Sequence, residues 1–208
     1  MRFTKKDLEI FQVKNFADRM QMIVDEISPK LAKLGELIQP QLSRIVAHEI
    51  YTHVAQHARR SVNPPDETWV AFGPDSKGYK SYVYFAICVG SLGVQARITA
   101  KQEFRNKEQY GEAILRFADK LQVLKGNKEM EDYTRRGTDL APTTVSDWPV
   151  FLQETAARFK EKPSAIIDLG INLPLSGDLS SHAIQALTRL APFYMIAKQT
   201  NGQPVNNY

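Results

Sequence analysis

The chain has 208 residues, of which 43% are hydrophobic and 24% charged, and its formal net charge is +4. These values are ordinary for a globular protein and predict a single domain over residues 1–208 with its own hydrophobic core. The one cysteine, Cys88, excludes an internal disulfide and a zinc site built from cysteines, and we expect it to be a buried, unreactive thiol.

The first residues lack the apolar stretch that a signal peptide requires. The longest weakly polar run, residues 82–94, is shorter than the roughly 20 residues that span a bilayer. We therefore expect a cytoplasmic protein without a membrane-inserted segment. Lys and Arg are interspersed with acidic residues, so a small anionic partner is favoured over nucleic acid, and the oligomeric state is not indicated.

The N-terminal third has a helical pattern. Thr4 and Asp7 have the spacing of a capping box for a short first helix. Apolar residues then recur at steps of three and four over residues 16–46, which places them on one helix face. Pro29 and Pro40 interrupt this stripe, so we expect successive helices or kinks in place of one straight rod.

The helical pattern is predicted to continue over residues 48–60 and to end before Asn63-Pro64-Pro65. From residue 68 the chain becomes rich in β-branched and aromatic residues, with glycine-containing breaks, and predicts three consecutive antiparallel strands within residues 68–100. In the third strand, Val94, Ala96 and Ile98 alternate with Gln95, Arg97 and Thr99. One face of the sheet is therefore core, and the other is polar or faces a ligand.

The remaining elements alternate between helix and strand. The predicted segments are a helix at 101–120, a short strand at 121–124, a loop at 127–147, a helix capped by Ser146 or Asp147 and running to about residue 160, a buried strand at 165–173, a helix at 179–198 broken at Pro192, and a frayed tail. Together they predict an α+β domain whose mainly antiparallel sheet is flanked by helices.

Polar groups that can hold a ligand are densest between His53 and Lys80. Glu49, His53 and His57 are four residues apart, which would place them on one face of the predicted helix. Two histidines at that spacing can share a metal ion, but the His-Glu-x-x-His pattern is absent and no third ligand is evident. A hydrogen-bonded histidine pair is the simpler interpretation, and we predict no metal and no other cofactor.

Arg59 and Arg60 would end that helix, where the helix dipole favours cations, and they would also suit a phosphate or carboxylate. Trp69 and Tyr79 can stack on a ring of a ligand or simply pack on the sheet. We predict one cleft where the helix meets the first strands, lined by His53, His57, Arg59, Arg60, Asn63, Trp69, Lys80 and Arg97.

The predicted ligand of this cleft is a small anion or a nucleotide. Two alternatives stay open: a nucleic-acid-associated protein, and a metal-dependent or hydrolytic enzyme that uses the His53/His57 face. A third is that Glu49, Asp66 and Glu67 neutralise the cations and no ligand binds. A P-loop, a G-x-G-x-x-G turn and a G-x-S-x-G elbow are absent from the sequence, so it identifies no catalytic residues.

The segment from His53 to Lys80, with its HVAQHARRSVNPP, TWVAF and GYK stretches, resembles the signature of the YktB-like proteins, bacterial proteins of unassigned activity found mostly in Firmicutes. The likeness extends to Phe11 with the helix at 19–35 and to residues 176–194, so it spans nearly the whole chain. It implies an α+β fold with an antiparallel sheet flanked by helices, and it implies no activity.

This chain departs from the YktB-like pattern at a few positions. Ser61, Glu67 and Lys77 stand where the pattern has Thr, Asn or Asp, and Arg. Residues 84–87 read Tyr-Phe-Ala-Ile where His-Phe-Gln-Ile is expected. A polar site that depends on that His and Gln is therefore not carried over to this chain.

Overall fold

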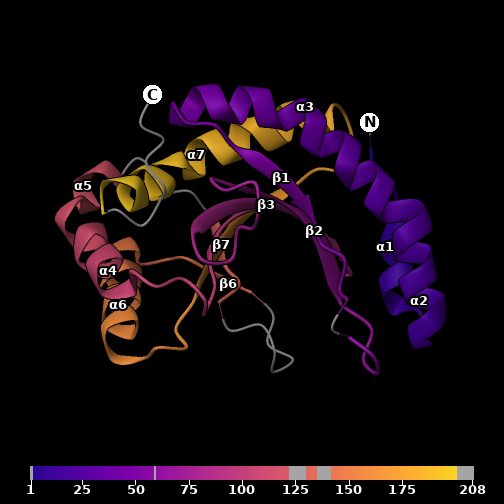
Figure 1. Ribbon diagram of the computed structural model, residues 1–208, viewed down its shortest axis with the longest axis horizontal. Helices are drawn as coiled ribbons and strands as arrows, with labels where there is room; N and C mark the ends of the chain where they lie inside the picture. Colours follow the sequence, from indigo (N-terminus) through magenta and orange to yellow (C-terminus); the bar gives the residue numbers. More distant parts are fainter. Residues whose placement is uncertain (1, 59, 122–129, 135–141, 201–208) are drawn as a thin grey trace.

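A computed structural model describes residues 2–58, 60–121, 130–134 and 142–200 (Figure 1). The strands are β1 Tyr51–Val54, β2 Glu67–Gly73, β3 Val83–Gly90, β4 Gly93–Ala100, β5 Met130–Asp132, β6 Thr143–Thr144 and β7 Ile167–Leu173. The helical segments are α1 Lys5–Glu9, η1 Ile10–Gln12, α2 Phe16–Met22, η2 Ile23–Ile27, α3 Ser28–Val46, α4 Lys107–Arg116, α5 Ala118–Leu121, α6 Trp148–Glu161 and α7 Leu179–Gln199.

All seven strands form one sheet in the order β1-β2-β3-β4-β7-β5-β6, and every pairing is antiparallel. Helix α3 packs on β1 and β2, whereas α7 packs on β3, β4 and β7, and the two helices contact each other (Figure 1). The predicted α+β architecture, with an antiparallel sheet flanked by helices, is confirmed.

The N-terminal helices follow the predicted signals closely. Thr4 and Asp7 form the capping box of α1, with the Thr4 amide donating to Asp7 Oδ2 over 2.7 Å. Residues 16–46 are helical throughout, but the five residues of η2 form a π-helical turn just before Pro29, and the helix bends there (Figure 1). Pro40 lies inside α3 and does not end it.

The predicted helix over residues 48–60 is wrong. Helix α3 ends at Ala47, which has a left-handed backbone with φ 47°, and His48 N donates to Ser43 O over 3.1 Å. Strand β1 follows and pairs with β2, with His53 opposite Ala71. Glu49, His53 and His57 therefore do not lie on one helix face, although their spacing is helical. Pairing with a strand that comes later in the chain decided the conformation, and local spacing did not reveal that partner.

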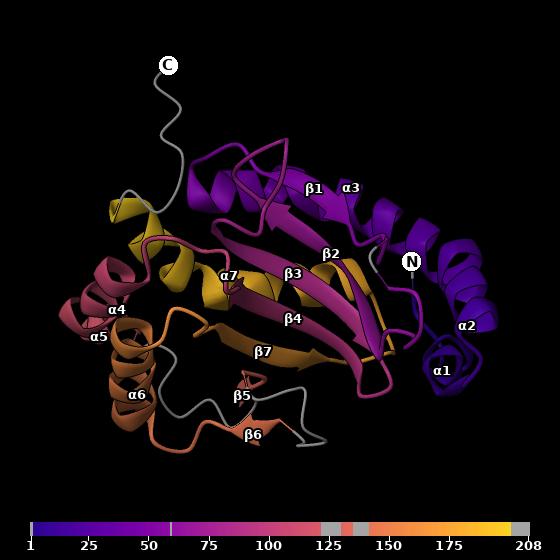
Figure 2. The same cartoon turned by 60° about the horizontal axis from the view of Figure 1, so that its bottom comes forward.

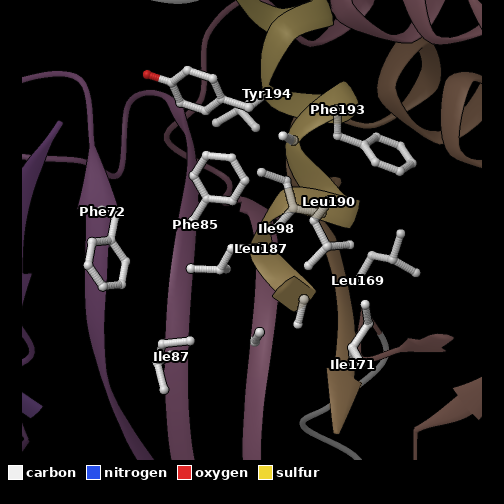
Figure 3. Packing of buried hydrophobic residues seen from close by; sticks show 14 of the residues in the cluster. Phe72, Phe85, Ile87, Ile98, Leu169, Ile171, Leu187, Leu190, Phe193 and Tyr194 are labelled. Carbon is white, nitrogen blue, oxygen red and sulfur yellow. The ribbon is translucent and has the colours of Figure 1, made fainter. Parts of the chain in front are cut away.

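The three predicted strands are present as β2, β3 and β4. Their apolar side chains and those of β7 face α3 and α7 and form the core (Figure 3). Phe85 of β3 stacks on Tyr194 of α7 with ring centroids 5.0 Å apart. Gly35 lets α3 approach the sheet, because a Cβ there would lie 3.1 Å from the Val70 side chain.

The C-terminal half agrees in part with the prediction. Asp147 caps α6 by accepting from Val150 N over 3.1 Å, and β7 is the predicted buried strand. Helix α7 runs unbroken through Pro192, contrary to the prediction, and the predicted helix at 101–120 is shorter, as α4 and α5. Short strands β5 and β6 fall in the predicted 127–147 loop. Residues 122–124 and the tail lie outside the described residues.

Candidate functional site

The sheet face opposite α3 and α7 is not covered by any of the described helices (Figure 2). Because side chains alternate along a strand, this face receives the residues that the core does not, including His53, Trp69, Tyr84, Cys88 and Arg97. It is the polar, potentially ligand-facing side that the alternation in β4 predicts.

A cluster of rings occupies this face near β1 and β2, and Tyr79 is at its centre. Trp69 Nε1 donates to Tyr79 Oη over 2.9 Å, and the His53 and Tyr79 ring centroids are 5.3 Å apart. Tyr79 also packs edge-on against Tyr84 at 4.7 Å, and His57 packs edge-on against Trp69 at 5.3 Å. Each ring is thus fixed by a neighbour, so the cluster forms a rigid wall.

Two adjoining pockets border this wall. The first, the His53 pocket, has a volume of about 810 Å³, and the second, the Trp69 pocket, about 420 Å³. They meet at Ala55, Gln56, Tyr79 and Lys80, which line both. The His53 pocket is further lined by Thr52, His53, Val54, Asp75, Lys77, Gly78, Ser81 and Tyr82, and the Trp69 pocket by His57, Ala58, Arg60 and Trp69.

Positive side chains outnumber negative ones among the residues that line the two pockets. Lys77, Lys80 and Arg60 are exposed cations that line the pockets, and Asp75 is the one carboxylate among the lining residues. The Asp75 carboxylate is already engaged, because it accepts from Lys77 N over 2.9 Å and from Tyr82 Oη over 3.4 Å. The pockets are therefore basic overall.

His57 is held in an unusual conformation between the pockets and the sheet. Its φ is 51°, which is uncommon for a residue other than glycine, and Nε2 hydrogen-bonds Thr68 Oγ1 over 3.0 Å. Burial, together with the positive charges of Arg60 and Lys80, lowers the pKa of His57 to about 4 despite an opposing effect of Glu67. His57 is therefore neutral at pH 7.

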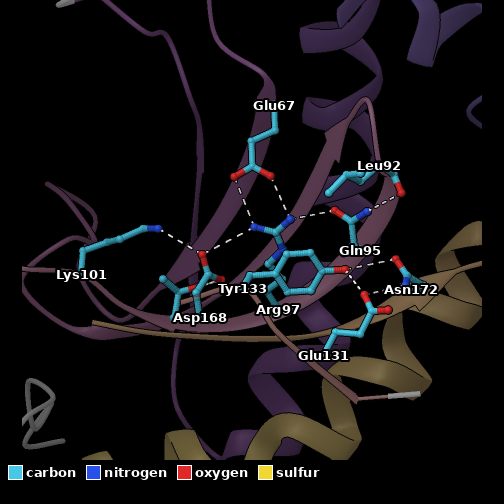
Figure 4. Close-up of polar contacts among 10 residues, drawn as sticks. Glu67, Leu92, Gln95, Arg97, Lys101, Glu131, Tyr133, Asp168 and Asn172 are labelled. Atoms are coloured by element: carbon cyan, nitrogen blue, oxygen red, sulfur yellow. Dashed lines mark hydrogen bonds and ion pairs between the residues drawn. The ribbon is translucent and has the colours of Figure 1, made fainter. Parts of the chain in front are cut away.

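A buried ionic network lies next to the ring cluster on the same face (Figure 4). The Arg97 guanidinium is only 1% exposed and donates to both carboxylate oxygens of Glu67, over 3.2 and 2.8 Å, and lies 3.5 Å from Asp168 Oδ2. Lys101 Nζ donates to the same Asp168 oxygen over 3.2 Å. Burial alone would raise the pKa of Asp168, but Lys101 and Arg97 outweigh it and hold that pKa below its usual value.

The network is also fixed by packing. Arg97 stacks on the Tyr133 ring, with 3.9 Å between the guanidinium carbon and the ring centroid. A Cβ on Gly170 would lie 2.9 Å from Arg97 Cγ and 3.0 Å from the Tyr133 ring, so only glycine leaves room for this arrangement. Trp69 lines both the Trp69 pocket and a small cavity of about 10 Å³ that the network residues also line, so it borders both.

The described residues were also compared with the requirements of a metal site, a reactive thiol and a membrane span. In the part of the chain that the structure describes, no three His, Cys, Asp or Glu side chains gather closely enough to hold a metal ion. Burial raises the pKa of the Cys88 thiol to about 12, so it is an unreactive thiol, as predicted. None of the described helices is long and apolar enough to cross a bilayer.

Comparison with known proteins places the chain. Residues 3–192 match a family model described as a domain of unknown function, DUF1054. The chain belongs to the DUF1054 family. It is 40% identical over 114 residues to a UPF0637 protein of Bacillus velezensis, in an alignment covering 55% of this chain and 54% of that protein. It is 34% identical over 122 residues to a UPF0637 protein of Exiguobacterium sibiricum, in an alignment covering 59% of this chain and 60% of that protein.

These two alignments span little more than half the length of the relatives. A UPF0637 protein of Lysinibacillus sphaericus aligns over 206 residues at 26% identity, covering 94% of this chain and 95% of that protein. The resemblance to a YktB-like family of bacterial proteins is thus confirmed, and the DUF1054 match includes all the residues of both pockets.

In this DUF1054 chain the structure brings five of the eight predicted cleft residues together. His53, His57, Arg60, Trp69 and Lys80 line the two adjoining pockets. They come together through β1, residues 55–58 and 60, β2 and the 74–82 loop, and not through a shared helix face.

Among the described residues, Arg97 and Asn63 do not join them. Arg97 is buried in the ionic network, and Asn63 contributes its backbone oxygen to Arg60 Nη1 over 3.2 Å without lining either pocket. Arg59 lies outside the described residues. The prediction omitted Lys77, Tyr82 and Asp168, and the lone carboxylate of Asp168 inside an apolar strand was the signal for the last of these.

Proposed function

We propose that the protein binds a small anionic ligand in the His53 and Trp69 pockets. The observation that carries the proposal is the meeting of the two pockets at Lys80, with Arg60 and Lys77 nearby and with the single carboxylate of Asp75 already hydrogen-bonded. Exposed cations that lack a carboxylate partner are suited to phosphate or carboxylate groups.

Two further features support this proposal. The cations lie beside a wall of rings that are already held in place. The rings would therefore lose little conformational entropy when a ligand binds. The pocket volumes, about 810 and 420 Å³, also fall in the range of about 300–1,000 Å³ that is usual for small-molecule sites.

Isothermal titration calorimetry with pyrophosphate tests the proposal. Lys80→Ala is expected to weaken pyrophosphate binding about fivefold, because one charge-assisted contact is lost. Lys160→Ala is the matched control, since Lys160 is an exposed lysine of α6, outside both pockets. The proposal fails if the unaltered protein binds neither pyrophosphate nor any nucleotide at millimolar concentration, or if both variants weaken binding equally.

A further inference from the structure

The two pockets differ in the chemistry that they offer. The Trp69 pocket is walled by the Trp69 and Tyr79 rings and the neutral His57 ring, and its cations, Arg60 and Lys80, are exposed. The His53 pocket has Lys77 and Lys80 on a turn that also supplies the Ser81 and Tyr82 side chains. Both pockets have cations, but the Trp69 pocket adds ring faces for a flat group, whereas the lysines of the His53 pocket suit an anionic one.

The Trp69 ring is prepared for stacking. Its Nε1 is satisfied by Tyr79 Oη at 2.9 Å, the His57 ring abuts it edge-on, and the buried ionic network lies behind it. A ring whose rotamer is already fixed loses little entropy when a ligand stacks on it. The left-handed backbone of His57, at φ 51°, holds the third wall of the pocket in place.

The two pockets are also connected in the order that such a ligand requires. Tyr79 and Lys80 are consecutive residues that line both pockets, so a ring against Tyr79 and an anion at Lys80 lie within one small molecule's length. His57 is neutral at pH 7, so it adds no charge next to the ring-binding wall.

We infer that the ligand is a nucleoside phosphate, with its base in the Trp69 pocket and its phosphates at Lys77 and Lys80 in the His53 pocket. The inference rests on the proposed function, since it names the class of the small anion. Base stacking on an aromatic side chain strengthens binding by about tenfold or more, so a nucleoside diphosphate should bind at least about tenfold more tightly than pyrophosphate.

Tryptophan fluorescence and calorimetry with adenosine diphosphate, guanosine diphosphate and pyrophosphate test this inference. The chain has two tryptophans, and Trp148 is 4% exposed in the core against Phe151. A bound base should therefore quench Trp69 emission, and pyrophosphate should not. Trp69→Leu should reduce diphosphate affinity by a much larger factor than pyrophosphate affinity, and Lys80→Ala should weaken both.

The outcomes separate the two proposals. Equal affinity for pyrophosphate and both nucleoside diphosphates, without an effect of Trp69→Leu, overturns the nucleotide inference and leaves the anion proposal standing. Binding of none of the three overturns both. Trp69→Phe controls for folding, because it keeps a ring in the wall; it should retain most of the diphosphate affinity, and a loss equal to that of Trp69→Leu would also overturn the inference.

Discussion

On one face of the sheet Phe85, Ile87 and Ile98 pack against α7, and on the other face Cys88 and Arg97 are just as deeply buried without a helix above them (Figures 2 and 3). The helix-covered face is stabilised by burial of apolar area, and this hydrophobic stabilisation does not depend on the direction of individual contacts. The second face depends on Arg97 meeting two carboxylates in a set geometry. Burial alone therefore does not tell which kind of interaction holds a face together.

The difference has a functional consequence. Charges on the second face are paired next to the sheet, whereas Arg60, Lys77 and Lys80 at the pockets reach solvent and form no ion pair with the residues that the structure describes. The paired charges belong to the buried network, whereas the exposed ones lie at the pockets where we propose that an anion binds.

The largest expected effect comes from Arg97→Ala. It removes the bidentate partner of Glu67 and one of the cations beside the buried Asp168, so the free energy of unfolding should fall by about 4 kcal/mol. Urea denaturation measures this change. Lys101→Ala is the control: its side chain is 31% exposed and Asp168 keeps Arg97, so the loss should be about 1 kcal/mol. Equal losses for the two variants would mean that Arg97 is not the centre of the network.

The helix-covered face should respond to loss of volume instead. Leu187→Ala removes a fully buried side chain of α7 and should cost about 3 kcal/mol. Val150→Ala, at a side chain 45% exposed on α6, should cost less than about 0.5 kcal/mol. Urea denaturation again gives both values, and a loss for Val150→Ala as large as that for Leu187→Ala would contradict the expectation that stability depends on buried volume.

A smaller effect is expected from pH at the edge of the second face. The pKa of His57 is about 4 in the folded protein and about 6.5 in an unfolded chain. The unfolded state therefore takes up a proton first, and stability should fall by about 1–2 kcal/mol as pH drops from 6.5 to 4. Urea denaturation of His57→Gln across this range should lack that part of the loss. If both proteins lose stability in parallel, His57 is not the group responsible.

The strands and the helix caps were predictable because their signals are local. Alternation in residues 93–100 fixed which side chains share a face, and Thr4 and Asp147 are capping residues in sequence and in structure. Pro192 was misjudged because it sits between the buried Ala191 and Phe193, whose packing outweighs the roughly 3 kcal/mol that a helical proline costs.

The site was only partly predictable, because some of its contacts join residues close in sequence and others join residues far apart. His53, Trp69 and Lys80 are close in sequence and do meet, although β1 replaces the expected helix. The predicted side of β4 for Arg97 is correct, but its burial depends on Glu67 and Asp168, which are far away along the chain. Partners at that separation are set by strand order, which spacing in one sequence does not reveal.

Helix α7 follows every other described element in the chain, and yet it covers three of the central strands. During synthesis β3, β4 and β7 leave the ribosome first, with the side that carries Phe85 and Ile98 bare. A nascent chain halted before Leu179 therefore exposes the apolar face of the sheet, which favours chaperone binding or aggregation. Translation of α7 supplies the helix that covers this apolar face.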